Sequence, residues 1–257
     1  MLIRKNSNKS VKLVCAQSSA HLDEQKAARH LPQRYHYKDK MTLILNILNK
    51  EMSILAADDK AFAGGYNRGS TESNAIYDFN KITLHASEDL ALGIAGNTQE
   101  HYYQPELFQN SSIDDVIEKI RKHMGNYLRV HNRPSLSKLE SFEVNDGILT
   151  FYDKDIESYF TYTFLFSPVH NQNRLYRGKE NVQIFISGSG SKTYEELINK
   201  SEIKDYKATS THKVALESCI QWVSDVFVKV GAIDSTCGTN AKIFISTKTN
   251  TKFYEYC

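Results

Sequence analysis

Short apolar runs separated by polar turns mark the chain from residue 42 onward. The first two runs, residues 42–48 and 53–57, flank the polar turn 49–51. They are too short and too rich in β-branched residues for helices, and the gap between them suits a hairpin, so they predict two paired strands. Both faces of these strands are apolar, and we therefore expect a sheet that is covered on both sides.

The rest of the pattern predicts further strands and three amphipathic helices. Residues 61–80 contain several Gly, Ser and Asn and predict a long loop. The remaining strands are expected at 81–84, 90–95, 148–152, 158–166, 173–177, 182–187, 241–247 and 251–256, and the helices at 112–128, 192–200 and 212–230. Strands with two apolar faces and helices with one predict an α/β (α+β) architecture, a four-layer α/β/β/α sandwich.

The front end of the chain differs from the rest in charge and pattern. Residues 1–40 hold nine Lys and Arg against three Asp and Glu and show no sustained period, whereas the remainder carries a net charge of −4. We interpret residues 1–41 as a basic N-terminal extension, as a propeptide, or as a mis-assigned start, in which case Met41 would be the true first residue. Residues 42–257 are expected to form one domain with a single sizeable core.

Composition narrows the expected partners and compartment. The overall net charge of +2 gives no case for nucleic-acid binding, and no apolar stretch is long enough to cross a membrane. The four cysteines form no C-x-x-C pair, which is typical of reduced thiols in a cytoplasmic protein. The nine histidines show no metal-ligand spacing, and the segment 188–193 lacks the Gly directly before Lys that a phosphate loop requires. We therefore expect no metal and no cofactor.

Candidate chemistry begins at the dipeptide Met41-Thr42. If Thr42 is the first residue of the mature chain, its own α-amine, with a pKa of about 8, can take the hydroxyl proton during nucleophilic attack. Lys81 would lower the pKa of that hydroxyl, and Asp58 would keep Lys81 charged and oriented. The turn that begins at Gly96 could offer a backbone N–H to an oxyanion.

Several motifs in this order resemble a proteasome β-type peptidase subunit, a class of the N-terminal nucleophile (Ntn) hydrolases. The resemblance covers most of residues 42–257 and rests on Thr42-Leu43-Ile44-Leu45, Leu55-Ala56-Ala57-Asp58, Lys81, Ala95-Gly96, Gly188-Ser189-Gly190 and Asp234-x-x-Cys237-Gly238. It implies Thr42 as the nucleophile, Asp58 and Lys81 as its activating pair, and Gly96 as the oxyanion donor. It also implies that Ser189 and Asp234 position the α-amine and a water molecule.

The chain departs from this family at two informative positions. The family usually has serine where this chain has Cys237, and a thiol is the weaker hydrogen-bond partner. A glycine usually precedes a self-cleaved threonine, whereas Met41-Thr42 resembles bacterial relatives that lose the methionine to an aminopeptidase. By the same resemblance, the pocket for the residue before the cut would be formed by Ala61, Phe79, Thr83, Ile94 and Thr98.

The sequence therefore predicts a threonine-type endopeptidase that hydrolyses peptide or unfolded protein substrates through an acyl-enzyme. The resemblance implies a homo-oligomeric ring and an ATP-dependent unfoldase as partner. Two alternatives stay open. A chain that keeps residues 1–41 has no free Thr42 amine and would be a non-catalytic structural subunit. A different Ntn hydrolase would be an amidase that acts on a small molecule.

Overall fold

The computed structural model describes residues 42–62, 75–85, 90–95, 112, 114–118, 122, 145–166, 171–204, 216–248 and 250–256. The chain divides into two compact units, residues 1–36 and 37–257, and every described residue belongs to the second unit. The N-terminal extension predicted for residues 1–41 lies outside the described residues.

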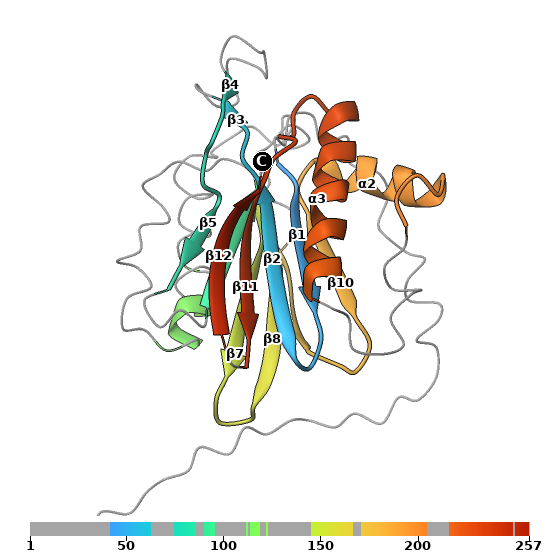
Figure 1. Cartoon of the computed structure of the whole chain (residues 1–257). Helices are drawn as coiled ribbons and strands as arrows, with labels where there is room; N and C mark the ends of the chain where they lie inside the picture. Colours follow the sequence, from blue (N-terminus) through green and yellow to red (C-terminus); the bar gives the residue numbers. More distant parts are fainter. Residues whose placement is uncertain are drawn as a thin grey trace, which may run out of the picture. The chain divides into compact units, whose positions relative to one another are not determined.

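The first sheet is built around the hairpin that the first two apolar runs predict. Strands β1 (Ile44–Leu48) and β2 (Met52–Asp58) pair antiparallel, as expected. Strand β10 (Gln183–Ser187) joins β1, and the hairpin of β11 (Ala241–Thr247) and β12 (Asn250–Tyr256) joins β2. The order is β10-β1-β2-β11-β12, so β1 and β2 lie at the centre of the sheet (Figure 1).

The second sheet is an antiparallel meander in chain order. It consists of β5 (Ile82–Leu84), β6 (Leu90–Ala95), β7 (Asn145–Asp153), β8 (Ser158–Phe166) and β9 (Asn171–Arg177). A further two-stranded ribbon, β3 (Ala61–Phe62) with β4 (Ala75–Ile76), lies within the segment 61–80 that the sequence predicts to be a loop. Two-residue strands are too short to produce a readable alternation of apolar and polar positions, so this prediction missed them.

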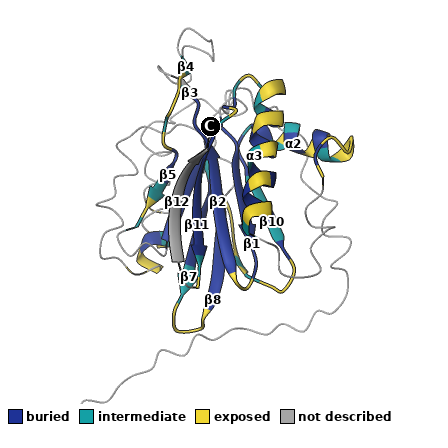
Figure 2. Cartoon of the chain, in the orientation of Figure 1, coloured by how far each residue is buried: buried dark blue, intermediate teal, exposed yellow. Residues whose placement is uncertain are grey.

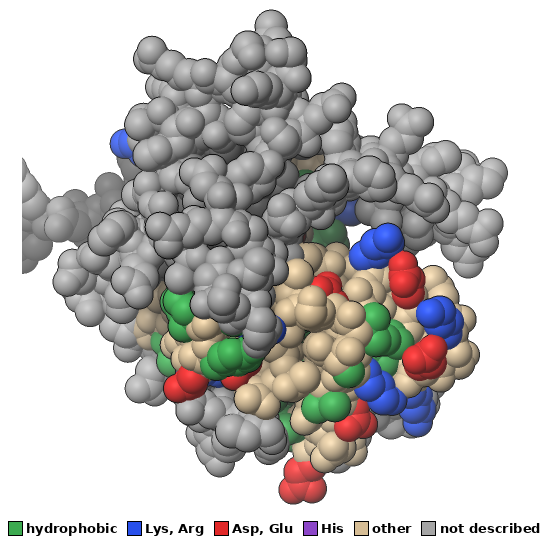
Figure 3. Space-filling view, turned by 90° about the horizontal axis from the view of Figure 1, so that it is seen from above, with side chains coloured by type: hydrophobic (Ala, Val, Ile, Leu, Met, Phe, Trp, Pro, Cys, Tyr) green, Lys and Arg blue, Asp and Glu red, His purple; other side chains and the backbone are tan. Residues whose placement is uncertain are grey.

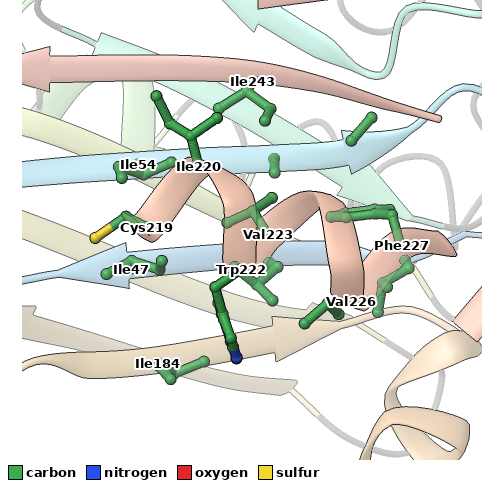
Figure 4. Packing of buried hydrophobic residues seen from close by; sticks show 14 of the residues in the cluster. Ile47, Ile54, Ile184, Cys219, Ile220, Trp222, Val223, Val226, Phe227 and Ile243 are labelled. Atoms are coloured by element: carbon green, nitrogen blue, oxygen red, sulfur yellow. The ribbon is translucent and has the colours of Figure 1, made fainter. Parts of the chain in front are cut away.

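Two helices cover the outer face of the first sheet. Helix α2 (Gly190–Asn199) follows β10, and helix α3 (Leu216–Ile233) precedes β11. The apolar face of α3, which includes Trp222, Val223 and Phe227, packs on Ile47 of β1 and Ile54 of β2 (Figure 4). The opposite face of α3 is exposed (Figure 2). Each fully buried aliphatic or aromatic side chain of this kind contributes about 1.5–3 kcal/mol.

The other face of the first sheet packs against the second sheet. Ile44, Leu55 and Ala57 from the first sheet share a cluster with Ala91 and Ile148 from the second. Successive strand residues point to opposite faces, so Leu45 and Ile47 reach the helices while Ile44 reaches the other sheet. This double burial is the reason that β1 and β2 are apolar on both faces.

A buried hydrogen-bond network also joins the two sheets. The Asn46 side-chain amide donates to Ser53 Oγ at 2.9 Å, and the Thr161 hydroxyl donates to Asn46 Oδ1 at 2.7 Å. Ser53 Oγ lies 2.6 Å from Thr150 Oγ1, and all four side chains are fully buried. Asn46 and Ser53 belong to the first sheet, and Thr150 and Thr161 belong to the second. These polar groups satisfy one another only when the two sheets meet in this register.

The prediction of a four-layer α/β/β/α sandwich is wrong. The protein is mostly β, with two antiparallel sheets and about twice as many described residues in strands as in helices. Helices α2 and α3 cover one outer face. On the outer face of the second sheet, the described helical residues are 114–118 and 122, of which Val116 joins the apolar cluster of that sheet. An apolar stripe with helical spacing predicts that a helix exists, but it does not determine how many layers the fold contains.

Candidate active site

Strand direction brings five segments of the chain to one end of the first sheet. Thr42 lies just before β1, and Asp58 is the last residue of β2. Because β10 runs antiparallel to β1, β10 ends at Ser187 beside the start of β1, and Ser189 follows at the same end of the sheet. Strand β11 begins opposite Asp58, so the turn 234–238 that precedes it also lies at this end. Lys81, directly before β5 of the second sheet, reaches the same end and contacts Asp58. Residues up to 196 positions apart in the chain, Thr42 and Gly238, thus meet at one end of the sheets.

The Asp58 carboxylate is the centre of the site. Its side chain is 0% exposed. Lys81 Nζ donates to both of its carboxylate oxygens, at 2.9 Å each. The backbone N–H groups of Leu43, Lys60 and Gly238 donate to the same carboxylate, at 2.6, 3.2 and 2.9 Å. Five hydrogen bonds therefore fix this carboxylate, and one of them comes from the residue that directly follows Thr42.

Electrostatics at Asp58 are set by burial and by these donors. Burial raises the pKa of the Asp58 carboxyl, while the Lys81 ammonium and the backbone N–H groups of Gly238 and Leu43 act to lower it. The Lys81 side chain is 1% exposed, so neither charge of the pair is solvated. A buried ion pair of this kind is costly to break, because removing one partner leaves an uncompensated charge.

Thr42 is held through its backbone by the loop between β10 and α2. Its N–H donates to Ser189 Oγ at 3.2 Å, and its carbonyl oxygen accepts from the backbone N–H of Gly190 at 3.2 Å. Ser189 occupies the N-cap position of α2, but its hydroxyl makes no capping hydrogen bond to the helix. The Ser189 hydroxyl is used at Thr42 instead.

Gly188 allows this close approach of the two segments. Its φ is +94°, a conformation that residues with a Cβ rarely adopt, and an added Cβ would lie 2.1 Å from the Thr42 carbonyl oxygen. The backbone N–H of Gly188 donates to Asp146 Oδ2 of β7 at 3.0 Å, which ties the loop to the second sheet. A glycine is therefore required at this position if Thr42 is to stay in place.

The turn after α3 brings Asp234, Thr236 and Cys237 to the site. Thr236 donates to the Asp234 carboxylate through both its backbone N–H, at 3.0 Å, and its hydroxyl. Thr236 Oγ1 lies 3.3 Å from Ser189 Oγ. The connection from Asp234 toward Thr42 thus runs through Thr236, a residue that the sequence analysis did not select. The signal that could have found it is the Asp-x-Thr spacing, in which an Asp side chain bonds the backbone two residues on.

Cys237 lies close to Ser189, with its sulfur 4.0 Å from the Ser189 hydroxyl. Burial raises the pKa of the Cys237 thiol, and the nearby negative charges of Asp58 and Asp234 raise it further. The thiol therefore stays protonated at neutral pH and is not a thiolate nucleophile. Its hydrogen bond to Ser189 is long and weak compared with that of Thr236.

The predicted pocket residues are placed only in part. Ala61, Phe79 and Thr83 are half-buried, and the backbone N–H of Phe79 donates to the Asp59 carbonyl at 2.8 Å. Ile94 is buried in the apolar cluster on the outer face of the second sheet. Gly96 and Thr98 lie outside the described residues, so the predicted oxyanion donor and the full pocket remain predictions.

Figure 3 looks onto this end of the sheets. Basic and acidic side chains alternate along one edge of the face, and the described part shows no continuous patch of one sign (Figure 3). Among the described residues, no group of three or more His, Cys, Asp or Glu could hold a metal ion. Within the same described ranges, no helix is long and apolar enough to cross a membrane.

Comparison with known proteins gives no family for the chain. No model of a known protein family matches it, and no curated protein is similar to it. The resemblance to proteasome β-type subunits therefore stays a hypothesis, and function has to be argued from the site itself.

Proposed function

We propose that the chain is a threonine-type peptidase in which Thr42, as the first residue of the mature protein, is the nucleophile. The single observation that carries this proposal is the buried Asp58–Lys81 pair, fixed by 2.9 Å contacts and bonded to the backbone directly after Thr42. We infer that the buried ammonium, held by the carboxylate that accepts from the backbone directly after Thr42, stabilises the alkoxide that forms during attack.

The reaction would proceed through an acyl-enzyme. The Thr42 hydroxyl would attack the peptide carbonyl while the Thr42 α-amine accepts the hydroxyl proton. That proton would pass to the leaving amine as the peptide bond breaks, leaving an ester on Thr42 Oγ1. Water would then hydrolyse the ester and restore the free hydroxyl. Gly96 is proposed as the N–H donor to the oxyanion, and no cofactor takes part.

The proposal extends to the setting of the enzyme. A homo-oligomeric ring in the cytoplasm, supplied with unfolded substrate by an ATP-dependent unfoldase, is the arrangement that the sequence resemblance favours. Size-exclusion chromatography with light scattering tests the ring, because a monomeric mass would contradict it.

A second candidate is a non-catalytic subunit of the same fold. It is favoured by the exposure of Thr42, which is only 2% in the full chain. A threonine this buried is closed to a substrate in the full chain. The two candidates therefore differ in the N-terminus of the mature protein.

The intact mass of the protein, expressed from DNA that keeps the region upstream of Met41, tests both candidates. A mass that matches a chain beginning at Thr42, together with turnover of fluorogenic peptides, supports the peptidase. Thr42→Ala is then expected to abolish turnover without loss of folding. Turnover retained by Thr42→Ala refutes Thr42 as nucleophile. A mass that matches a chain beginning at Met1, with no turnover of peptides, supports the non-catalytic subunit. Cleavage of small acyl amides but not of peptides would identify an amidase instead.

A further inference from the structure

The Thr236 hydroxyl lies between the Asp234 carboxylate and the Ser189 hydroxyl, and the direction of its hydrogen bonds can be worked out from these two neighbours. The Thr236 hydroxyl donates to the Asp234 carboxylate, so its oxygen acts as an acceptor toward a neighbouring hydroxyl. The Ser189 hydroxyl lies 3.3 Å from that of Thr236. Ser189 is therefore the donor to Thr236, and its own lone pairs face the Thr42 nitrogen at 3.2 Å.

Other partners of the Ser189 proton are poorer. The Cys237 sulfur is 4.0 Å away and is a weak acceptor. The Thr42 carbonyl oxygen is 3.4 Å from Ser189 Oγ and already accepts the backbone N–H of Gly190. The Thr236 hydroxyl, bonded to a carboxylate, is the stronger acceptor because charge-assisted bonds polarise the next bond in a chain.

We propose that Thr236 is a positioning residue that links Asp234 to Ser189 and so increases the basicity of the Thr42 α-amine. This inference rests on the proposed function, because only a chain that begins at Thr42 has that amine. When the amine takes the hydroxyl proton, the resulting ammonium donates to Ser189, and the chain of hydroxyls ends at the negative charge of Asp234. The Thr236 hydroxyl thereby connects the ammonium to its counter-charge.

Loss of the Thr236 hydroxyl would reverse the Ser189 bond. Without its acceptor, the Ser189 O–H can turn and donate to the lone pair of the neutral Thr42 amine. A hydrogen bond to the neutral form disfavours protonation. The amine would then be a weaker base, while substrate binding would not change.

The test compares Thr236→Val, which replaces the hydroxyl by a methyl group of similar size, with Thr236→Ser, which keeps the hydroxyl. Thr239→Val is the matched control, because Thr239 is an exposed threonine just beyond the same turn. Each variant is made in a chain begun at Met41, whose methionine the host aminopeptidase removes. Every contact described above lies within residues 42–256, so this chain retains them all. Circular dichroism verifies the fold.

The first readout is the pKa of the Thr42 amine, measured by competitive acetylation across pH with mass spectrometry. Thr236→Val is expected to lower that pKa by about one unit, whereas Thr236→Ser and Thr239→Val leave it unchanged. The second readout is peptide hydrolysis, where Thr236→Val is expected to reduce kcat roughly tenfold with KM unchanged. An amine pKa in Thr236→Val equal to that of the wild type overturns the proposal.

The two readouts separate this inference from the proposed function. Acetylation needs no turnover, so an inert protein whose amine pKa depends on Thr236 refutes the peptidase and keeps the hydroxyl chain. An active peptidase whose amine pKa does not depend on Thr236 does the reverse. If the Val variant fails to fold in the shorter chain, a double-mutant cycle of Ser189→Ala and Thr236→Val in the full-length protein decides. Additive losses of stability would mean that the two hydroxyls are not coupled.

Discussion

Replacing Lys81 by methionine removes the cation that faces the buried Asp58 carboxylate but keeps an unbranched apolar stem of similar length. The carboxylate is 0% exposed and would retain only its backbone N–H donors. Breaking a buried pair from one side costs about 3–5 kcal/mol. That is a large part of the total stability of a domain, about 5–15 kcal/mol.

The loss is expected to depend on pH. Burial raises the pKa of Asp58 and Lys81 lowers it, so the pKa of the folded-state carboxyl rises further when Lys81 is absent. A carboxyl with a raised folded-state pKa stabilises the fold below its unfolded pKa of about 4 and loses that contribution as the pH rises through the folded pKa. Lys81→Met should therefore be closest to the wild type near about pH 4 and less stable relative to it at about pH 8.

Urea unfolding at both pH values measures this. Lys248→Met is the matched control, because Lys248 lies 3.5 Å from Glu51 in a pair whose side chains are 42% and 54% exposed. Such a surface pair is worth about 0–1 kcal/mol. A Lys81→Met loss no larger than that of the control, and equal at both pH values, would refute the view that the Asp58–Lys81 pair is buried and mutually dependent. Asp58→Asn combined with Lys81→Met should recover part of the stability, since no charge is then left unpaired.

Three further outcomes follow from the contacts described above. Gly188→Ala should destabilise the fold by at least about 1–3 kcal/mol, because its φ is +94° and the new Cβ meets the Thr42 carbonyl; an unchanged melting temperature would contradict this. Phe227→Ala, in the core under α3, should cost about 3–5 kcal/mol in urea unfolding, whereas Val228→Ala, 51% exposed on the same helix, should cost little; equal losses would refute the assigned helix face. Cys237 should resist thiol reagents at mildly alkaline pH until the protein is unfolded, because burial raises its pKa; labelling as fast as that of a small thiol would show an accessible thiolate.

The sequence predicted strands well where burial leaves a clear pattern. The run 53–57 lies within β2, and 241–247 coincides with β11, because both strands are buried on two faces. Helix α2 begins at Gly190 rather than at the predicted 192, and its N-cap residue Ser189 makes no side-chain capping hydrogen bond. The layer count failed, because it depends on what covers each sheet and not on the pattern of any one element.

The candidate site was predictable residue by residue but not in its connections. Asp58, Lys81 and Ser189 each carry a functional group that fits the proposed chemistry. The structure places Ser189 at Thr42 and the Asp58–Lys81 pair at the backbone of Leu43, the next residue. Their convergence depends on which strands are neighbours, which no local pattern encodes. Thr236 was missed because a threonine in a turn is ordinary. Only the 3.3 Å distance from its hydroxyl to that of Ser189, 47 positions earlier in the chain, gives it a role.

The order β10-β1-β2-β11-β12 also has a consequence for how the protein is made. The hairpin of β1 and β2 leaves the ribosome early, yet the strands that pair with its two edges begin only at Gln183 and Ala241. At about 5–20 residues per second, many seconds pass before those edges are paired. During that time an apolar hairpin with two open edges can pair with other chains. Newly made copies are therefore expected to need shielding, and overproduction without chaperones should yield aggregates seeded by residues 44–58.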